Sequence, residues 1–195
     1  MKTQRCGWCS DDPLYIAYHD EEWGKPEHDE ARLFEMLCLE GQQAGLSWIT
    51  VLKKRESYRQ HFFNHPIADI AAFTDDFLET KLSDAGLIRH LGKLKAIRDN
   101  AIAWQALKAQ VGDVSKWLWQ FVDATPQHND VADYRKAPAQ TELSLKLSKT
   151  LKKMVSNLLV QPPAMRLCRQ WVWSMTMKMI VNLKLHNPPE RFKSA

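Results

Sequence analysis

Apolar residues recur at helical spacing along most of the chain, and this periodicity limits the fold more than any other feature of the sequence. After a potential N-cap at Asp29, the residues Leu33, Phe34, Leu37 and Cys38 follow the i, i+3, i+4 pattern of an amphipathic helix. Strand-like alternation is nearly absent. The pattern therefore predicts an all-α fold.

Further helices are expected wherever this periodicity follows a capping residue. Glycines should interrupt it, with Gly41 and Gly45 ending the first helix and Gly86 ending a short one. The proline-containing stretch 125–140 is predicted to be a loop. Helices are expected to start at Ser47, at Thr74 or Asp75, and at Ser115. Two more are expected to span about residues 92–111 and 141–154.

The composition is that of a globular protein able to bury a core. The chain has 195 residues, of which 45% are hydrophobic and 26% are charged. No apolar run approaches the roughly 20 residues of a membrane span, and none has the form of a signal peptide. We therefore expect a cytoplasmic protein without a membrane partner, whose four cysteines are thiols or metal ligands rather than disulfides.

Charge and glycine are distributed unevenly along the chain. The net charge is +4, yet residues 155–195 hold six Lys and Arg against one acid, so the rest of the chain is slightly acidic. All seven glycines precede residue 113. Charge alone is therefore weak evidence for nucleic-acid binding, and the C-terminal stretch differs in kind from the body.

The N-terminal stretch contains candidate metal ligands. Cys6 and Cys9 form a C-x-x-C pair, and Cys6 with His19 is the best ligand pair. A structural zinc site needs four ligands, so two are insufficient. A lone C-x-x-C without a following βαβ pattern is a weak signal, and two ordinary thiols remain an alternative.

Aromatic side chains surround a carboxylate between residues 15 and 48. One interpretation is a set of core aromatics beside a surface carboxylate at a helix end. The other is a pocket for a flat, electron-poor ring, since aromatic faces attract cations and a carboxylate adds charge and a hydrogen-bond acceptor. A purine alkylated on a ring nitrogen is such a cation. The residues concerned are Tyr15, Tyr18, Trp23, Trp48 and Glu40.

Four stretches resemble one known family. They read R-C-G-W-C-S-D-D-P-L-Y-I-A-Y-H-D-E-E-W-G from residue 5, L-F-E-M-L-C-L-E-G-Q-Q-A-G-L-S-W-I-T-V-L-K-K-R from 33, A-G-L-I-R-H-L-G-K-L-K-A-I from 85, and L-S-K-T-L-K-K from 147. The chain is similar, over about residues 4–154, to the 3-methyladenine DNA glycosylase I family. The E-G-Q-Q-A-G-L-S-W run is especially distinctive.

The resemblance implies a function and a site. The family has a helix-hairpin-helix glycosylase fold and excises 3-methyladenine from double-stranded DNA, using water as the nucleophile. It would act here as a monomer in base-excision repair. By the resemblance, Glu40 contacts the flipped base as the catalytic residue, Tyr18 and Trp48 stack around it, and Tyr15 and Trp23 complete the pocket.

Further roles carry over from the same motifs. The resemblance places Leu46 at the DNA, near the gap that the flipped base leaves. It also makes Cys6 and His19 the first two of four zinc ligands, which in the family tie the two ends of the chain together. The other two ligands belong to a C-terminal N-D-H-x-x-x-C motif that this sequence lacks.

The resemblance stops at Met154. The family continues with G-F-K-F-V-G, its DNA-binding hairpin, whereas residues 155–160 here read V-S-N-L-L-V. Written as GGT TTC AAA TTT GTT GGT, the family's motif reads V-S-N-L-L-V once the first G is lost. The codons for residues 175–181, read one nucleotide earlier, likewise encode the N-D-H that begins the missing C-terminal motif. We therefore interpret 155–195 as a frameshifted, partly disordered basic tail on a helical body, 1–154.

Three functions follow from these observations. The chain as written is an active glycosylase, or it is an impaired, glycosylase-like protein that binds DNA weakly. Independently of the family, it is a small thiol or zinc module built on Cys6 and Cys9. Loss of the hairpin would favour impairment, because its backbone N–H groups would hold DNA phosphates. The body would also lose a packing partner and be destabilised.

The frameshift interpretation predicts a specific lesion in the gene. Resequencing across codons 152–158 should reveal a lost G beside the Met154 codon. An unbroken reading frame, together with an intact mass that fits the 195-residue product, would contradict it.

Overall fold

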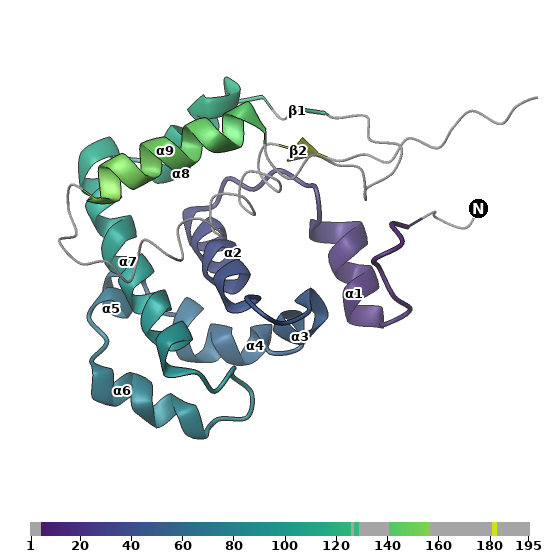
Figure 1. Cartoon of the computed structure of the whole chain (residues 1–195), viewed down its shortest axis with the longest axis vertical. Helices are drawn as coiled ribbons and strands as arrows, with labels where there is room; N and C mark the ends of the chain where they lie inside the picture. The colour runs from purple at the N-terminus through teal and green to yellow at the C-terminus, as the bar shows by residue number, and fades with distance from the viewer. Residues whose placement is uncertain (1–4, 126, 129–140, 157–180, 183–195) are drawn as a thin grey trace, which may run out of the picture.

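The computed structural model describes residues 5–125, 127–128, 141–156 and 181–182 of the chain. In this part the backbone is built almost wholly of helices (Figure 1). The larger α-helices are α2 (Glu30–Gln42), α7 (Leu91–Val111) and α9 (Glu142–Ser156). The shorter α-helices are α1 (Pro13–Ala17), α3 (Trp48–Leu52), α4 (Arg55–Tyr58), α5 (Ile67–Ala71), α6 (Asp75–Thr80) and α8 (Val114–Trp119).

Tighter and wider turns extend several of these helices. Two π-helical turns continue α1 and α4, and two 3₁₀ turns continue α6 and α8. A two-residue parallel pair joins β1 (Gln127–His128) to β2 (Val181–Asn182). The four turns are η1 (Tyr18–Glu22), η2 (Arg59–Phe63), η3 (Lys81–Ser83) and η4 (Gln120–Val122).

Short polar side chains start the helices as their sequence positions suggest. Asp29 accepts a hydrogen bond from the Arg32 amide at the start of α2, and Thr74 caps α6 through the Phe77 amide. Each such cap satisfies a backbone donor that the first turn of a helix leaves open, and contributes about 1 kcal/mol. These helix starts and the long helix α7 were predicted correctly.

Some predicted boundaries were wrong. Gly41 does not end the first helix, which continues to Gln42, because a glycine within a helix lowers its stability without breaking it. Gly86 lies beyond η3 rather than at the end of α6. Asp113, not Ser115, caps α8, since its carboxylate accepts from the Lys116 amide while Ser115 is buried inside the helix.

The hydrophobic core forms around α7. This helix packs against α2, α5, α6, α8 and α9 (Figure 1). Its inward side chains Leu94, Ile97 and Ala101 are fully buried. Each fully buried Leu or Ile contributes about 1.5–3 kcal/mol. The core thereby holds α2, which carries Glu40, against the start of α7.

The all-α prediction is confirmed: across the described residues the strands are limited to one short pair, which joins β1 of the body to β2 of the tail. Most of the tail interpretation, over 157–180 and 183–195, lies outside the described residues. Across the described residues, every helix is too short or too polar to cross a lipid bilayer.

The turn at Gly86 allows α4 to approach closely. A methyl group added at Gly86 would lie 2.5 Å from the Ser57 Oγ and 2.9 Å from its Cβ. The hydroxyl can rotate away but the Cβ cannot. Gly86→Ala should therefore lower the free energy of unfolding by about 1–3 kcal/mol in urea denaturation.

Gly41→Ala is the matched control, because an added methyl there meets nothing within 4 Å. It should leave the free energy of unfolding equal or raise it by up to about 1 kcal/mol. Equal stability of the two variants would contradict the close approach at Gly86.

Candidate functional site

Four aromatic rings meet where the N-terminal segment packs on α3. The ring centroid of Trp8 lies 5.1 Å from that of Tyr15 and 6.4 Å from that of Tyr18. The Tyr18 ring in turn lies 5.5 Å from that of Trp48. Tyr18 is buried, whereas the other three remain partly exposed. Tyr15, Tyr18, Trp48 and Trp8 are called the ring cluster below.

The position of Tyr18 follows from a change of helix type. α1 passes directly into the wider turn η1 at Tyr18, where the Trp23 amide donates to the Tyr18 carbonyl over 2.8 Å. Such π-helical turns are rare and occur frequently at functional sites. The turn places the Tyr18 ring against Trp48, the first residue of α3.

Glu40 lies beside the ring cluster. It is partly exposed in the last turn of α2. Burial strongly raises the pKa of the Tyr18 hydroxyl, and the negative charge of Glu40 raises it further. Tyr18 is therefore a neutral phenol at any physiological pH, next to a group that supplies negative charge.

Leu46 lies in the turn that joins α2 to α3. Its amide donates to the Gln43 carbonyl over 2.7 Å, and Gly45 has φ +76°, a conformation that favours glycine. The Leu46 side chain is 39% exposed. Leu46 thus carries an apolar side chain on the exposed turn that follows α2, and its contact with DNA stays a prediction.

Trp23 lies at the outer side of the ring cluster rather than within it. Its ring stacks on His19 at 5.5 Å and meets Trp8 edge-on at 5.2 Å. The structure thus brings Tyr15, Tyr18 and Trp48 together as predicted. Trp23 reaches them only through Trp8.

Trp8 is the residue that the sequence reasoning missed. It was noted only as part of the C-G-W-C stretch, yet its ring contacts those of Tyr15, Tyr18, His19 and Trp23. The available signal was the concentration of aromatic residues in this region of the sequence.

The two predicted zinc ligands are adjacent. The buried Cys6 donates its backbone N–H to His19 Nε2 over 3.3 Å, while His19 Nδ1 lies 2.8 Å from Asp20 Oδ1. His19 Nε2 is thus engaged with the protein backbone. Burial raises the pKa of the Cys6 thiol.

No complete metal site exists within the described residues. No group of three or more His, Cys, Asp or Glu side chains there could hold an ion. Cys9 instead directs its thiol to the carbonyls of Ser10 and Tyr15, at 3.6 and 3.7 Å. Because structural zinc requires four ligands, these residues by themselves do not fit it.

An ion pair lies close to Tyr18. Arg55 of α4 donates two hydrogen bonds to the Glu22 carboxylate, over 2.6 and 2.8 Å, and thereby fastens the end of η1 to α4. Burial alone would raise the pKa of Glu22, but the bonds to Arg55 outweigh it and hold the pKa below its usual value. The charges of both residues act on the Tyr18 hydroxyl.

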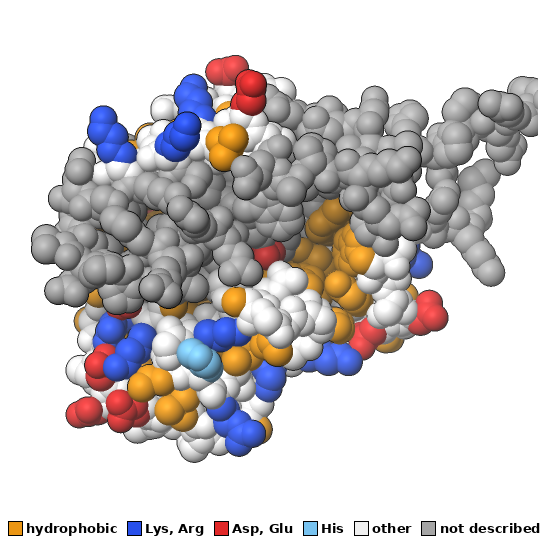
Figure 2. Space-filling model, viewed as in Figure 1, with side chains coloured by type: hydrophobic (Ala, Val, Ile, Leu, Met, Phe, Trp, Pro, Cys, Tyr) orange, Lys and Arg blue, Asp and Glu red, His pale blue; other side chains and the backbone are white. Residues whose placement is uncertain are grey.

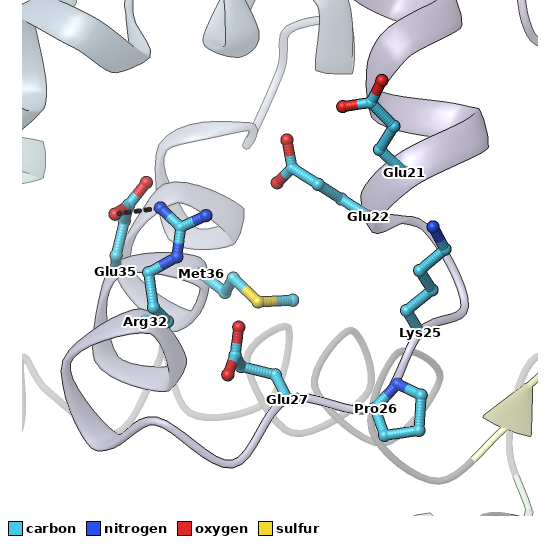
Figure 3. Close-up of a pocket in the computed structure, with 8 residues that line it drawn as sticks. All are labelled: Glu21, Glu22, Lys25, Pro26, Glu27, Arg32, Glu35 and Met36. Carbon is cyan, nitrogen blue, oxygen red and sulfur yellow. Dashed lines mark ion pairs between the residues drawn. The ribbon is translucent and has the colours of Figure 1, made fainter.

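A separate cavity of about 230 Å³ opens between η1 and α2 (Figure 3). Glutamates dominate its lining, together with Lys25 and Arg32, and none of the predicted base-binding residues lines it. Among the described residues that line it, none is an aromatic on which a purine could stack. Figure 2 instead shows hydrophobic side chains gathered near α1, in the region of the ring cluster.

Comparison with known proteins places this arrangement in a class. The profile of the methyladenine glycosylase family matches residues 8–160. The chain therefore belongs to the methyladenine glycosylase family.

Individual relatives agree with this placement. The chain is 52% identical over 151 residues to DNA-3-methyladenine glycosylase of Haemophilus influenzae, covering 77% of this chain and 82% of the relative. It is 51% identical over 150 residues to DNA-3-methyladenine glycosylase 1 of Escherichia coli, covering 77% and 80%.

Solved structures show the same fold. The chain is similar to a crystal structure of 3-methyladenine DNA glycosylase I, with a TM-score of 0.80 and 46% identity, covering 92% of this chain and 94% of that one. It is also similar to the 3-methyladenine DNA glycosylase I of Staphylococcus aureus, with a TM-score of 0.82 and 28% identity, covering 98% of each chain.

The Arg55–Glu22 pair should stabilise the fold measurably. Arg55→Met leaves a half-buried carboxylate without its partner, and we expect a loss of about 1–3 kcal/mol in the free energy of unfolding at pH 7. Without Arg55, the pKa of Glu22 rises above its wild-type value, because the bonds that lower it are lost while burial still raises it. As the pH falls, Glu22 of the variant is therefore protonated first, and the wild type loses its ion pair only below the ordinary glutamate pKa of about 4.3. The deficit should thus shrink as the pH falls toward that value and shrink further below it.

Lys53→Met is the control, because it removes an exposed ion pair with Asp12. It should cost less than about 1 kcal/mol. Urea denaturation at pH 7 and at about pH 4 distinguishes the two variants. An Arg55→Met deficit that matches the control, or that does not change with pH, would contradict the assignment.

Proposed function

We propose that this chain is a monofunctional DNA glycosylase that excises 3-methyladenine from alkylated DNA by hydrolysing the N-glycosidic bond. One observation links the proposed activity to particular residues. The rings of Trp8 and Trp48 lie next to that of Tyr18, and the negative charge of Glu40 acts on the Tyr18 hydroxyl. Membership of the methyladenine glycosylase family supports the same activity.

The substrate explains this chemistry. Methylation at N3 makes adenine a cation and weakens its bond to the sugar. Aromatic faces attract a cation by about 1–2 kcal/mol when it is desolvated. Glu40 would add an opposite charge and accept a hydrogen bond from the exocyclic amine, whereas unmodified adenine offers no positive charge. The ring cluster would thus select the damaged base.

The reaction needs little acid catalysis. The C1′–N9 bond breaks and its electron pair moves to the base, which leaves as neutral 3-methyladenine. A water oxygen bonds to C1′ and gives up a proton to solvent. In this scheme Glu40 is the catalytic residue because it contacts the base. Tyr18 and Trp48 stack around the base, and Tyr15 and Trp23 complete the pocket.

Access to the base requires that it leave the duplex. Flipping costs a few kcal/mol, and least for a damaged base. The exposed Leu46 lies on the turn between Glu40 and Trp48. We propose that it enters the gap in double-stranded DNA while the base occupies the ring cluster.

A second candidate is an impaired glycosylase. It is favoured by the sequence after Met154, which lacks both the G-F-K-F-V-G hairpin and the N-D-H-x-x-x-C motif. On this proposal the chain has a helical body, 1–154, and an atypical tail, 155–195, and it binds DNA more weakly than its relatives. A thiol or zinc module gains no support from the contacts of Cys9 with backbone carbonyls.

The zinc and cellular proposals follow from the same reasoning. We propose that Cys6 and His19 are the remaining half of a structural zinc site that is incomplete in this chain. We further propose that the protein acts as a monomer in the cytoplasm, where its DNA substrate and reduced thiols are found.

Glu40→Gln tests the site directly, because it keeps the side chain's size and removes its charge. Hydrogen bonds to charged groups contribute about 1.5–3 kcal/mol, so release of 3-methyladenine from methylated duplex DNA should fall about tenfold to a hundredfold. The rate of base release can be followed by chromatography.

Glu56→Gln is the matched control, since its side chain is 70% exposed. It should release the base at the wild-type rate. Wild-type release by Glu40→Gln would contradict the role of Glu40. No release by the wild-type chain itself would favour the impaired form.

A further inference from the structure

A lysine from α7 holds the turn that separates Glu40 from Leu46. The Lys93 ammonium group donates to the Gln42 carbonyl over 2.8 Å and to the Ala44 carbonyl over 2.7 Å. The last carbonyls of an α-helix have no partner within the helix. Lys93 therefore satisfies the end of α2 and the first part of the turn at once.

The contact is reciprocal, which fixes its register. The buried Gln42 side chain donates through Nε2 to the Lys93 carbonyl over 3.0 Å, and its Oε1 accepts from the Tyr58 hydroxyl over 2.9 Å. The Tyr58 hydroxyl also accepts from the Ile88 amide. Three segments distant in the sequence thus meet behind the turn.

The turn itself has few other constraints. The Gln43 amide donates to the Glu40 carbonyl, and the Leu46 amide donates to the Gln43 carbonyl. Ala44 lies between these two bonds, beside Gly45 in its left-handed conformation. The bond from Lys93 to the Ala44 carbonyl therefore connects the turn to the core.

The environment of Lys93 suits this role. The positive charge lies at the C-terminal end of α2, where the helix dipole favours a cation. Burial lowers the pKa of Lys93. Partial burial of the Lys93 ammonium costs desolvation energy, and its hydrogen bonds to the two carbonyls offset that cost.

We propose that Lys93 is a positioning residue for base excision: it holds the turn so that Glu40 and Leu46 keep the spacing that a flipped base requires. The inference rests on the proposed function. Because the turn is already ordered, Leu46 can enter the duplex without a further loss of the conformational entropy of the turn. Small displacements of groups that contact a substrate reduce rates strongly, even when the altered residue is remote from the chemistry.

The test compares Lys93→Met with two control variants on the same helix. Lys95→Met removes a lysine that makes an ion pair with Asp75 at the surface. Ile97→Val lowers stability through a fully buried core position without touching the turn. Single-turnover release of 3-methyladenine from methylated duplex DNA is measured well below the melting temperature of the least stable variant.

Lys93→Met should release the base at least tenfold more slowly than the wild type, while Lys95→Met and Ile97→Val stay within twofold. Lys93→Arg, which keeps a charged donor, should recover most of the rate. A purely structural role for Lys93 would lower the melting temperature and leave the rate per folded molecule unchanged.

Two outcomes separate this inference from the proposed function. If the wild type releases the base and Lys93→Met does so within twofold, the positioning role is wrong. If the wild type releases none, the proposed function itself fails. Should Lys93→Met not fold, Lys93→Gln takes its place, with the same tenfold loss expected and wild-type release overturning the proposal.

Discussion

The packing of Tyr18 against Trp48, beside the carboxylate of Glu40, is the interaction on which the site depends. It joins three segments: the π-helical turn after α1, the end of α2 and the start of α3. The buried Tyr18 phenol is neutral, and the negative charges that act on it come from Glu40 and from Glu22, which is bonded to Arg55. A flat cation is the ligand class that such an arrangement attracts.

The scaffold sets this contact through a few long-range bonds. Arg55 fastens the turn that carries Tyr18 to α4, and Lys93 fastens the turn after Glu40 to α7. Both are cations that donate two hydrogen bonds each to oxygen acceptors at the end of a segment. The ring cluster thus lies between two anchored segments, and the exposed Leu46 projects from one of them.

The sequence predicted the parts of this arrangement that depend on local patterns. Helical periodicity and the cap at Asp29 correctly indicated the course of α2 toward Glu40. The bonds of Lys93 could not be predicted, because they join positions about fifty residues apart and leave no periodic trace. Trp8 was missed for a different reason: it lies in the same aromatic-rich region as Tyr15 and Tyr18, but only the fold of the N-terminal segment shows that its ring contacts theirs. The sequence predicted Ser115 as the cap of α8, but the helix begins earlier, at Val114, so Asp113 caps it and Ser115 is buried within it.

The central claim, that the ring cluster beside Glu40 recognises the alkylated base as a cation, is tested most directly by titrating the protein with cationic 3,9-dimethyladenine and with neutral 9-methyladenine. The methyl group on N9 takes the place of the sugar and keeps the positive charge that free 3-methyladenine loses. Indole N–H resonances of Trp8 and Trp48 would report binding by nuclear magnetic resonance. We predict that 3,9-dimethyladenine shifts both resonances at concentrations where 9-methyladenine shifts neither, with little change at Trp104 in the core. Equal responses to the two bases, or shifts confined to residues away from the ring cluster, would contradict the claim.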